Sequence, residues 1–271
     1  MENKFLRLLQ LGNIIAAFLT VIINLLANII PIGGKYTGEL SDNIPNLFVP
    51  VGLTFSIWGV IYILIILFAL YLARDFFKKE ITTKPFLGKI SYLFIIAGIA
   101  NILWIFLWHY EQVTLSLLAM ILLFSSLLAI YLRLGIGKER VSIKEKLFIH
   151  IPISVYIGWI TVATIANVTA VLVKNNWDGF GISDQIWTIL VIVVATIITI
   201  IVLLTRKDYS YSAVIIWALF GIYLKRVTDD PIFGIKTQIA YTAGIAIIII
   251  IMTIAITIFL RYYKKGAPLK S

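Results

Sequence analysis

The chain has 271 residues, of which 61% are hydrophobic and 13% are charged, and its formal net charge is +10. Soluble domains carry about 25% charged residues, so this composition excludes an ordinary soluble protein and predicts a polytopic membrane protein. In that setting the positive charge is typical of basic cytoplasmic loops beside anionic lipid, and no nucleic-acid partner is expected. The absence of cysteine excludes disulfides, thiolate metal sites and cysteine nucleophiles.

Eight apolar runs follow one another along the chain, and a membrane-spanning helix needs about 20 such residues. They cover residues 8–30, 50–72, 90–108, 113–133, 147–173, 184–204, 211–227 and 238–262. Two-residue alternation is absent, so the runs predict an all-α bundle and not a barrel. The first run is too long for a signal peptide and is expected to be a retained span. The seventh run is short, and the orientation of the last third of the chain depends on it.

Lysine and arginine gather in alternate loops. The loops 73–89 and 133–146 are rich in both residues, whereas the loop 31–49 holds only Lys35. By the positive-inside rule, eight spans place both chain termini in the cytoplasm. The loop with Lys225 and Arg226 is the exception, because it carries basic residues on the other side.

Three of the expected helices each carry a stripe of aromatic and polar side chains at helical spacing. The stripes consist of Trp58 and Tyr62, of Asn101, Trp104 and Trp108, and of Trp159, Ala163 and Asn167. An amide in hydrocarbon needs hydrogen-bond partners, so each asparagine should face the bundle interior and bring its tryptophan neighbours with it. Interhelical hydrogen bonding, at about 0.6 kcal/mol per bond, explains any single asparagine. Three such stripes together favour a shared aromatic cavity.

Three motifs in the same helices resemble the TspO/MBR family of tryptophan-rich sensory proteins. They are PxGxTFxIWxxIY at 50–62, NxxWxxLW at 101–108 and WxxxATxxN at 159–167. Their order and spacing agree with the family, and the resemblance covers roughly residues 8–173. It implies a TspO-like five-helix transmembrane bundle over residues 1–173. Residues 174–271 are expected to add about three transmembrane helices of unknown role.

The resemblance also implies a pocket beneath the loop 31–49. By their motif positions, nine residues are expected to line or brace this pocket: Pro50, Trp58, Tyr62, Asn101, Trp104, Trp108, Trp159, Ala163 and Asn167. The family binds tetrapyrroles such as protoporphyrin IX or haem, and some members bind sterols, so a tetrapyrrole is expected as a ligand and not as a required cofactor. Flat aromatic walls with a few amide donors suit a planar macrocycle with carboxylates on its rim. Dimers are common in the family, which implies a homodimer.

These features lead to the hypothesis of a binding or sensory protein in a prokaryotic plasma membrane, without catalytic residues. The two histidines, His109 and His150, lack partners at metal-binding spacing, so no metal site is expected. One alternative is a transporter of a hydrophobic solute with a cavity lined from 184–262. Coupling to protons or sodium is disfavoured, because no carboxylate lies well inside an expected span. A porphyrin-degrading enzyme with redox-active tryptophans is another alternative. The last three helices are expected to pack against the bundle or a second copy, without ligand contact.

Overall fold

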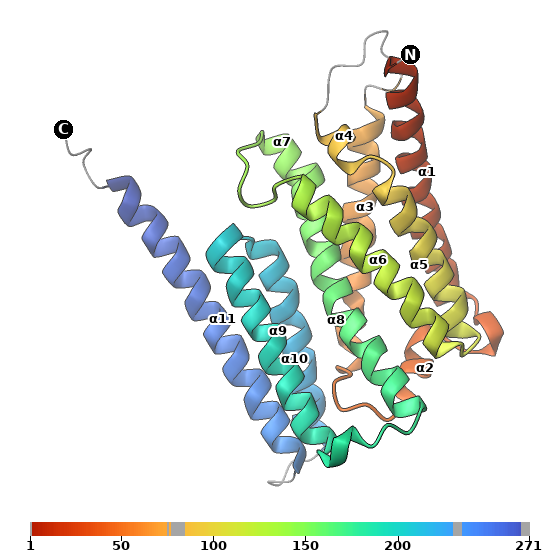
Figure 1. Cartoon of the computed structure of the whole chain (residues 1–271), viewed down its shortest axis with the longest axis vertical. Helices are drawn as coiled ribbons and strands as arrows, with labels where there is room; N and C mark the ends of the chain where they lie inside the picture. The colour runs from red at the N-terminus through yellow and green to blue at the C-terminus, as the bar shows by residue number, and fades with distance from the viewer. Residues whose placement is uncertain (1, 75, 77–84, 230–234, 267–271) are drawn as a thin grey trace.

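The computed structural model describes residues 2–74, 76, 85–229 and 235–266. Long helices dominate this part of the chain (Figure 1): α1 (Glu2–Ile29), α3 (Ile57–Ala73), α5 (Leu93–His109), α6 (Val113–Arg133), α8 (Ile151–Lys174), α9 (Asp184–Arg206), α10 (Tyr209–Asp229) and α11 (Ile235–Gly266). Short helical segments join them: η1 (Ile32–Gly34), α2 (Thr37–Asp42), η2 (Gly52–Ser56), α4 (Pro85–Ile90), α7 (Ile143–Glu145), η3 (Lys146–His150) and η4 (Gly179–Gly181). The expected all-α polytopic membrane fold is confirmed.

Seven helices in the described ranges are long and apolar enough to cross a membrane. The short run at 211–227 is among them, and the span there covers Tyr209–Thr228. The remaining long helix, α5, is apolar but has only 17 residues. A turn at Ser91, whose φ is 51°, separates it from α4. With a rise of about 1.5 Å per residue, α5 is about 26 Å long, slightly less than the hydrocarbon core of about 30 Å.

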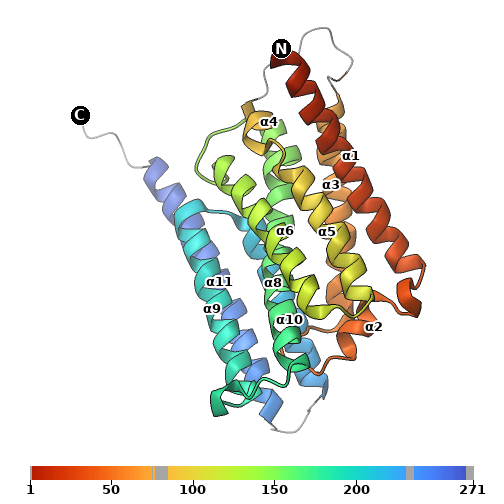
Figure 2. The same ribbon diagram turned by 45° about the vertical axis from the view of Figure 1, so that its right-hand side comes forward.

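The first five long helices form a closed bundle. Helix α1 packs against α3 and α5, α5 packs against α6, α6 packs against α8, and α8 returns to α3 (Figure 2). This closure creates an interior that is separate from lipid. The polar side chains of the three stripes can therefore be buried against one another, as hydrocarbon requires of them.

Helices α1 and α5 approach closely around Gly98. A Cβ atom at this position would lie 3.2 Å from Ala16 Cβ and 3.1 Å from Thr20 Oγ1, so glycine permits the contact. One turn away on each helix, the Asn24 side-chain amide donates to Asn101 Oδ1 at 2.5 Å. Close backbone packing by small residues and an interhelical amide pair are both typical of membrane helix interfaces.

The three C-terminal helices form a layer beside α8. Helix α10 packs directly against α8 and also contacts η2, while α9 and α11 pack against α10 (Figure 1). Helix α1 begins and α11 ends at the same end of the molecule (Figure 1). The loops that follow α1, α5 and α8 lie at the opposite end, together with α2.

Candidate ligand-binding site

A cavity of about 60 Å³ lies inside the five-helix bundle, at the end opposite the start of α1. Helices α3, α5 and α8 form its walls, and the residues between α1 and α3 cover it. We call it the aromatic cavity. Its lining consists of Thr37, Ser41, Ile44, Asn46, Val49, Pro50, Phe55, Trp58, Trp104, Trp108, Trp159, Val162, Ala163, Ala166, Asn167 and Ala170.

The first wall consists of aromatic rings from α3 and α8. The Trp58 ring stacks on Tyr62 with centroids 5.7 Å apart and planes inclined by 24°. It meets the Trp159 ring edge to face at 6.1 Å and 81°. Phe55, in η2, also meets the Trp159 ring edge to face, with centroids 5.9 Å apart and an angle of 85°. Offset stacked and edge-to-face arrangements are the favourable geometries for aromatic pairs, so these contacts hold Trp58 and Trp159 in fixed orientations.

The second wall belongs to α5, where Trp104 and Trp108 stack with centroids 5.8 Å apart and an angle of 20°. Each indole N–H has a partner. Trp104 Nε1 donates to Asn167 Oδ1 at 2.9 Å, and Trp108 Nε1 donates to the carbonyl oxygen of Thr37 at 3.4 Å. The Asn167 amide in turn donates to Ser116 Oγ of α6 at 3.2 Å. Hydrogen bonds thus connect α5, α6, α8 and the residues above the cavity.

The three sequence stripes therefore meet, and seven of the nine expected residues line the aromatic cavity: Pro50, Trp58, Trp104, Trp108, Trp159, Ala163 and Asn167. The other two lie one layer deeper. Tyr62 lies beneath the Trp58 ring, and the Asn101 side chain donates to Tyr156 Oη at 3.1 Å while it accepts from Asn24. Tyr62 and Asn101 brace the walls and do not line the cavity.

The indole N–H of Trp159 differs from those of α5. Trp159 is 2% exposed, yet its Nε1 has no hydrogen-bond partner. An unpaired buried donor costs about 1–3 kcal/mol, so such groups are uncommon and often mark a functional site. Trp159 also lines the aromatic cavity, so this unpaired donor belongs to a cavity residue.

Residues 43–51, which we call the roof, close the cavity from above. Asn46 attaches the roof to α8, because its side-chain amide donates to Thr169 Oγ1 at 2.5 Å. Its Oδ1 accepts from the backbone N–H of Phe48 at 2.9 Å, which shapes the turn. Phe48, Val49 and Pro50 are buried. Motif reasoning found only Pro50 in this segment.

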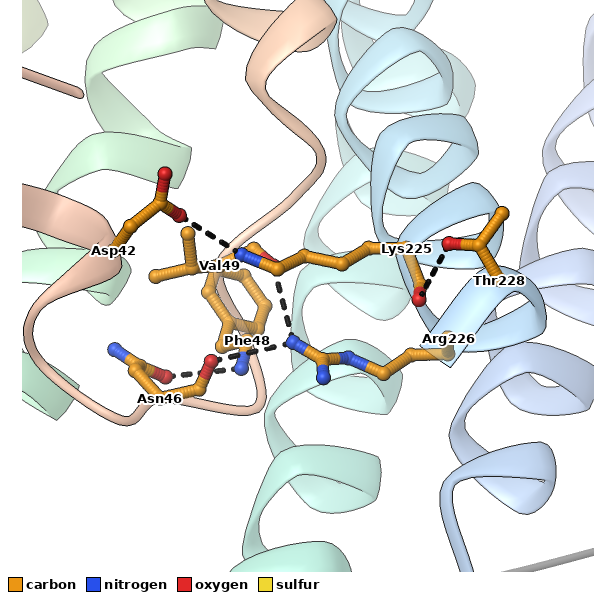
Figure 3. A network of polar contacts seen from close by, with 7 residues as sticks. All are labelled: Asp42, Asn46, Phe48, Val49, Lys225, Arg226 and Thr228. Atoms are coloured by element: carbon orange, nitrogen blue, oxygen red, sulfur yellow. Dashed lines mark hydrogen bonds and ion pairs between the residues drawn. The ribbon is translucent and has the colours of Figure 1, made fainter. Parts of the chain in front are cut away.

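Helix α10 holds the opposite side of the roof (Figure 3). The Arg226 guanidinium, which is 3% exposed, donates from Nη2 to the carbonyl oxygens of Asn46 and Val49, each at 3.3 Å. Lys225 pairs with Asp42, at the end of α2, at a distance of 3.2 Å.

Further along α10, Trp217 Nε1 donates to the carbonyl oxygen of Thr54 at 2.9 Å, and the Val51 N–H donates to the carbonyl oxygen of Gly221 at 3.1 Å. Among the described residues, those of α9, α10 and α11 are absent from the cavity lining. Of these three helices, α10 holds the roof from outside the cavity.

The two histidines have different surroundings. His109 Nδ1 lies 2.7 Å from the carbonyl oxygen of Ile105, and its Nε2 lies 3.2 Å from Thr37 Oγ1, so this ring supports α2. His150 is buried in the π-turn η3, 3.9 Å from Glu145. Within the described ranges, histidine, aspartate and glutamate do not gather into groups of three or more that could hold a metal ion.

A closed bundle of long apolar helices with an aromatic cavity under a clamped loop defines a polytopic helical membrane protein. The chain belongs to the family described as TSPO-like protein, whose model matches residues 10–256. The matched range continues past α8 through α9 and α10 and into α11. No curated protein and no solved structure matches the chain significantly.

Proposed function

We propose that this protein binds a planar hydrophobic ligand of the tetrapyrrole class in the aromatic cavity and acts as a membrane binding or sensory protein. The observation that carries the proposal is the meeting of Trp58, Trp104 and Trp159, from three different helices, around one space. Rigid aromatic faces offer a large contact area to a flat ligand. The unpartnered Trp159 N–H adds a directed donor for a ring or carbonyl acceptor.

The volume of the cavity sets a condition on this function. Small-molecule sites commonly measure about 300–1,000 Å³, whereas the aromatic cavity measures about 60 Å³. A tetrapyrrole therefore enters only if the roof moves away from the walls. We infer that the described structure is a closed state, stabilised by the contacts of α10 with the roof.

The position of the cavity favours binding within the first five helices over transport through all eight. A transporter that uses the whole chain requires a cavity lined from 184–262. The aromatic cavity is lined instead by residues between 37 and 170, and its lining carries no charged side chain. The α10 residues that approach it, Trp217, Gly221 and Arg226, contact the backbone of its cover.

The test is a titration of the purified full-length protein with protoporphyrin IX, followed by quenching of tryptophan fluorescence and by porphyrin absorbance. Trp58→Ala is expected to weaken binding about tenfold, or about 1.4 kcal/mol. Trp177→Ala is the matched control, since this ring packs against Phe180 and Trp187, outside the cavity lining. Equal affinities for wild type and Trp58→Ala would refute the site. Progressive loss of porphyrin absorbance would indicate turnover, and the protein would then be an enzyme.

A further inference from the structure

A second and larger cavity adjoins the first. Its volume is about 410 Å³, within the usual range for small-molecule sites. It lies between the residues that precede the roof, the turn between α5 and α6, and the end of α8, and we call it the vestibule. Its lining consists of Lys35, Leu40, Asn43, Ile44, Pro45, Trp108, Glu111, Val113, Val173, Lys174 and Asn176. Ile44 and Trp108 line both cavities, so the two are adjacent, and a roof that moves away from the walls would let one molecule occupy both.

The charged side chains of the vestibule converge on one point. Lys35 Nζ lies 2.5 Å from Glu111 Oε1, and Lys174 Nζ donates to the backbone carbonyl oxygen of Glu111 at 2.7 Å. Two ammonium groups and one carboxylate therefore lie close together, with an excess of one positive charge. The hydrogen bond and charge of Lys35 hold the pKa of Glu111 below its usual range, so Glu111 is ionised at neutral pH. Its carboxylate can be displaced, because the pair is exposed to water.

We propose that the vestibule receives an anionic group, a carboxylate carried by the ligand itself, while the apolar body of the ligand occupies the aromatic cavity. This inference rests on the proposed function and narrows its ligand to an amphiphile with a flat apolar body and at least one carboxylate. The Glu111 carboxylate marks the position that the ligand carboxylate takes beside Lys35. Lys174 supplies a second ammonium group, of whose three N–H donors one binds the Glu111 backbone.

The two cavities are expected to recognise different parts of the ligand. The side chains of the aromatic cavity are neutral, so that cavity selects for shape and apolar surface. Discrimination between an acid and its neutral ester must therefore arise in the vestibule. Charges at an exposed rim act mainly on the association rate, and salt screens their attraction for a ligand. The preference for the acid over the ester should therefore weaken as ionic strength rises.

The experiment uses the full-length protein in nanodiscs of a zwitterionic phosphatidylcholine, titrated with protoporphyrin IX and with its dimethyl ester. Lys35→Gln and Lys174→Gln are each expected to weaken binding of the diacid about threefold and to leave the ester unchanged. Glu111→Gln removes the competing carboxylate and is expected to strengthen binding of the diacid about threefold. A misfolded variant cannot produce this gain. Lys144→Gln, an exposed lysine on α7, is the control.

Three results would overturn the inference. Equal effects on diacid and ester in every variant would show that the lysines act only on the fold. Glu111→Gln weakening the diacid would show that the ion pair itself is needed. Loss of the diacid preference in nanodiscs with phosphatidylglycerol, with ester binding intact, would assign the vestibule to a lipid headgroup. In all three cases the proposed function stands if the ester binds; if neither probe binds, both proposals fail.

Discussion

The guanidinium of Arg226 lies 3.3 Å from the carbonyl oxygen of Val49, a residue that lines the aromatic cavity from 177 positions earlier in the chain. Arg226 is 3% exposed, so its charge is almost fully withdrawn from water. A buried charge is tolerated only when it is well hydrogen-bonded, and here two carbonyl oxygens of the roof accept from it. The basic residues that depart from the positive-inside pattern thus have a structural task, because Arg226 and Lys225 hold the cover of the cavity.

Arg226→Gln is expected to loosen the roof. Hydrogen bonds to charged groups contribute about 1.5–3 kcal/mol each, and a shorter neutral side chain does not reach both carbonyls. Ligand association and dissociation should both become at least several-fold faster, because the closed state no longer holds the roof in place. Stopped-flow fluorescence with protoporphyrin IX measures both rates, and a thermal melt should show a lower Tm.

Lys225→Gln is the matched control for Arg226→Gln. Its ion pair with Asp42 is exposed, and such pairs contribute about 0–1 kcal/mol. The two variants remove the same charge from neighbouring positions on α10. Similar kinetics in Lys225→Gln and Arg226→Gln would show that net charge matters and that the two carbonyl contacts do not.

Gly221→Ala should separate α10 from η2. A Cβ atom at this position would lie 1.8 Å from Thr54 Oγ1 and 2.9 Å from Pro50 Cβ, so the segments must move apart. We expect a lower Tm and faster ligand exchange. Gly244→Ala on α11 is the control, because its nearest neighbour would be 3.7 Å away, and the substitution should be neutral or stabilising by up to about 1 kcal/mol. Adding Thr54→Ala to Gly221→Ala should recover part of the loss.

Helical spacing was sufficient to predict which helix faces meet. Trp58, Trp104 and Trp159 lie on polar stripes that hydrocarbon would not tolerate, so each stripe had to face the interior. Helical spacing does not determine whether a residue on that face lies at the level of the cavity, because residues four positions apart are separated by about 6 Å along the helix axis. Tyr62 and Asn101 share a face with cavity residues but lie a layer below them. The same 159–170 face also carries Val162, Ala166 and Ala170, which helical spacing from Trp159 could have found.

The contacts of α10 with the roof and with η2 could not be predicted from the sequence. Arg226, Trp217 and Gly221 all bind backbone groups, and a backbone carbonyl leaves no mark on the residue type that carries it. The partners are also far apart in the chain, 163 residues in the case of Trp217 and Thr54. The sequence predicts only that the last three helices pack against the bundle or a second copy, without ligand contact.

The ion pair of Lys35 and Glu111 should make the stability of the protein depend on pH in the acid range. Lys35 holds the pKa of Glu111 below its unfolded value, so the stabilisation is present above that value, about 4.3, and is lost as the pH falls through the folded-state pKa. The difference in Tm between wild type and Glu111→Gln should therefore be constant near neutral pH and shrink below about pH 4.5. Thermal melts at a series of pH values measure it. A difference that grows toward acid would contradict the pairing.

Trp159→Phe should separate binding from stability. The indole N–H of Trp159 has no partner in the protein, so its removal breaks no hydrogen bond, and the remaining ring keeps most of the contacts with Trp58 and Phe55. Affinity for a ligand with an acceptor at this position should fall about threefold to tenfold, with little change in Tm. Trp104→Phe is the converse case: it leaves Asn167 Oδ1 without its 2.9 Å donor, and it should lower Tm as well as affinity. Isothermal titration and thermal melts of the two variants together make the comparison. If Trp159→Phe lowers Tm as much as Trp104→Phe and leaves affinity unchanged, the Trp159 donor serves the fold and not a ligand.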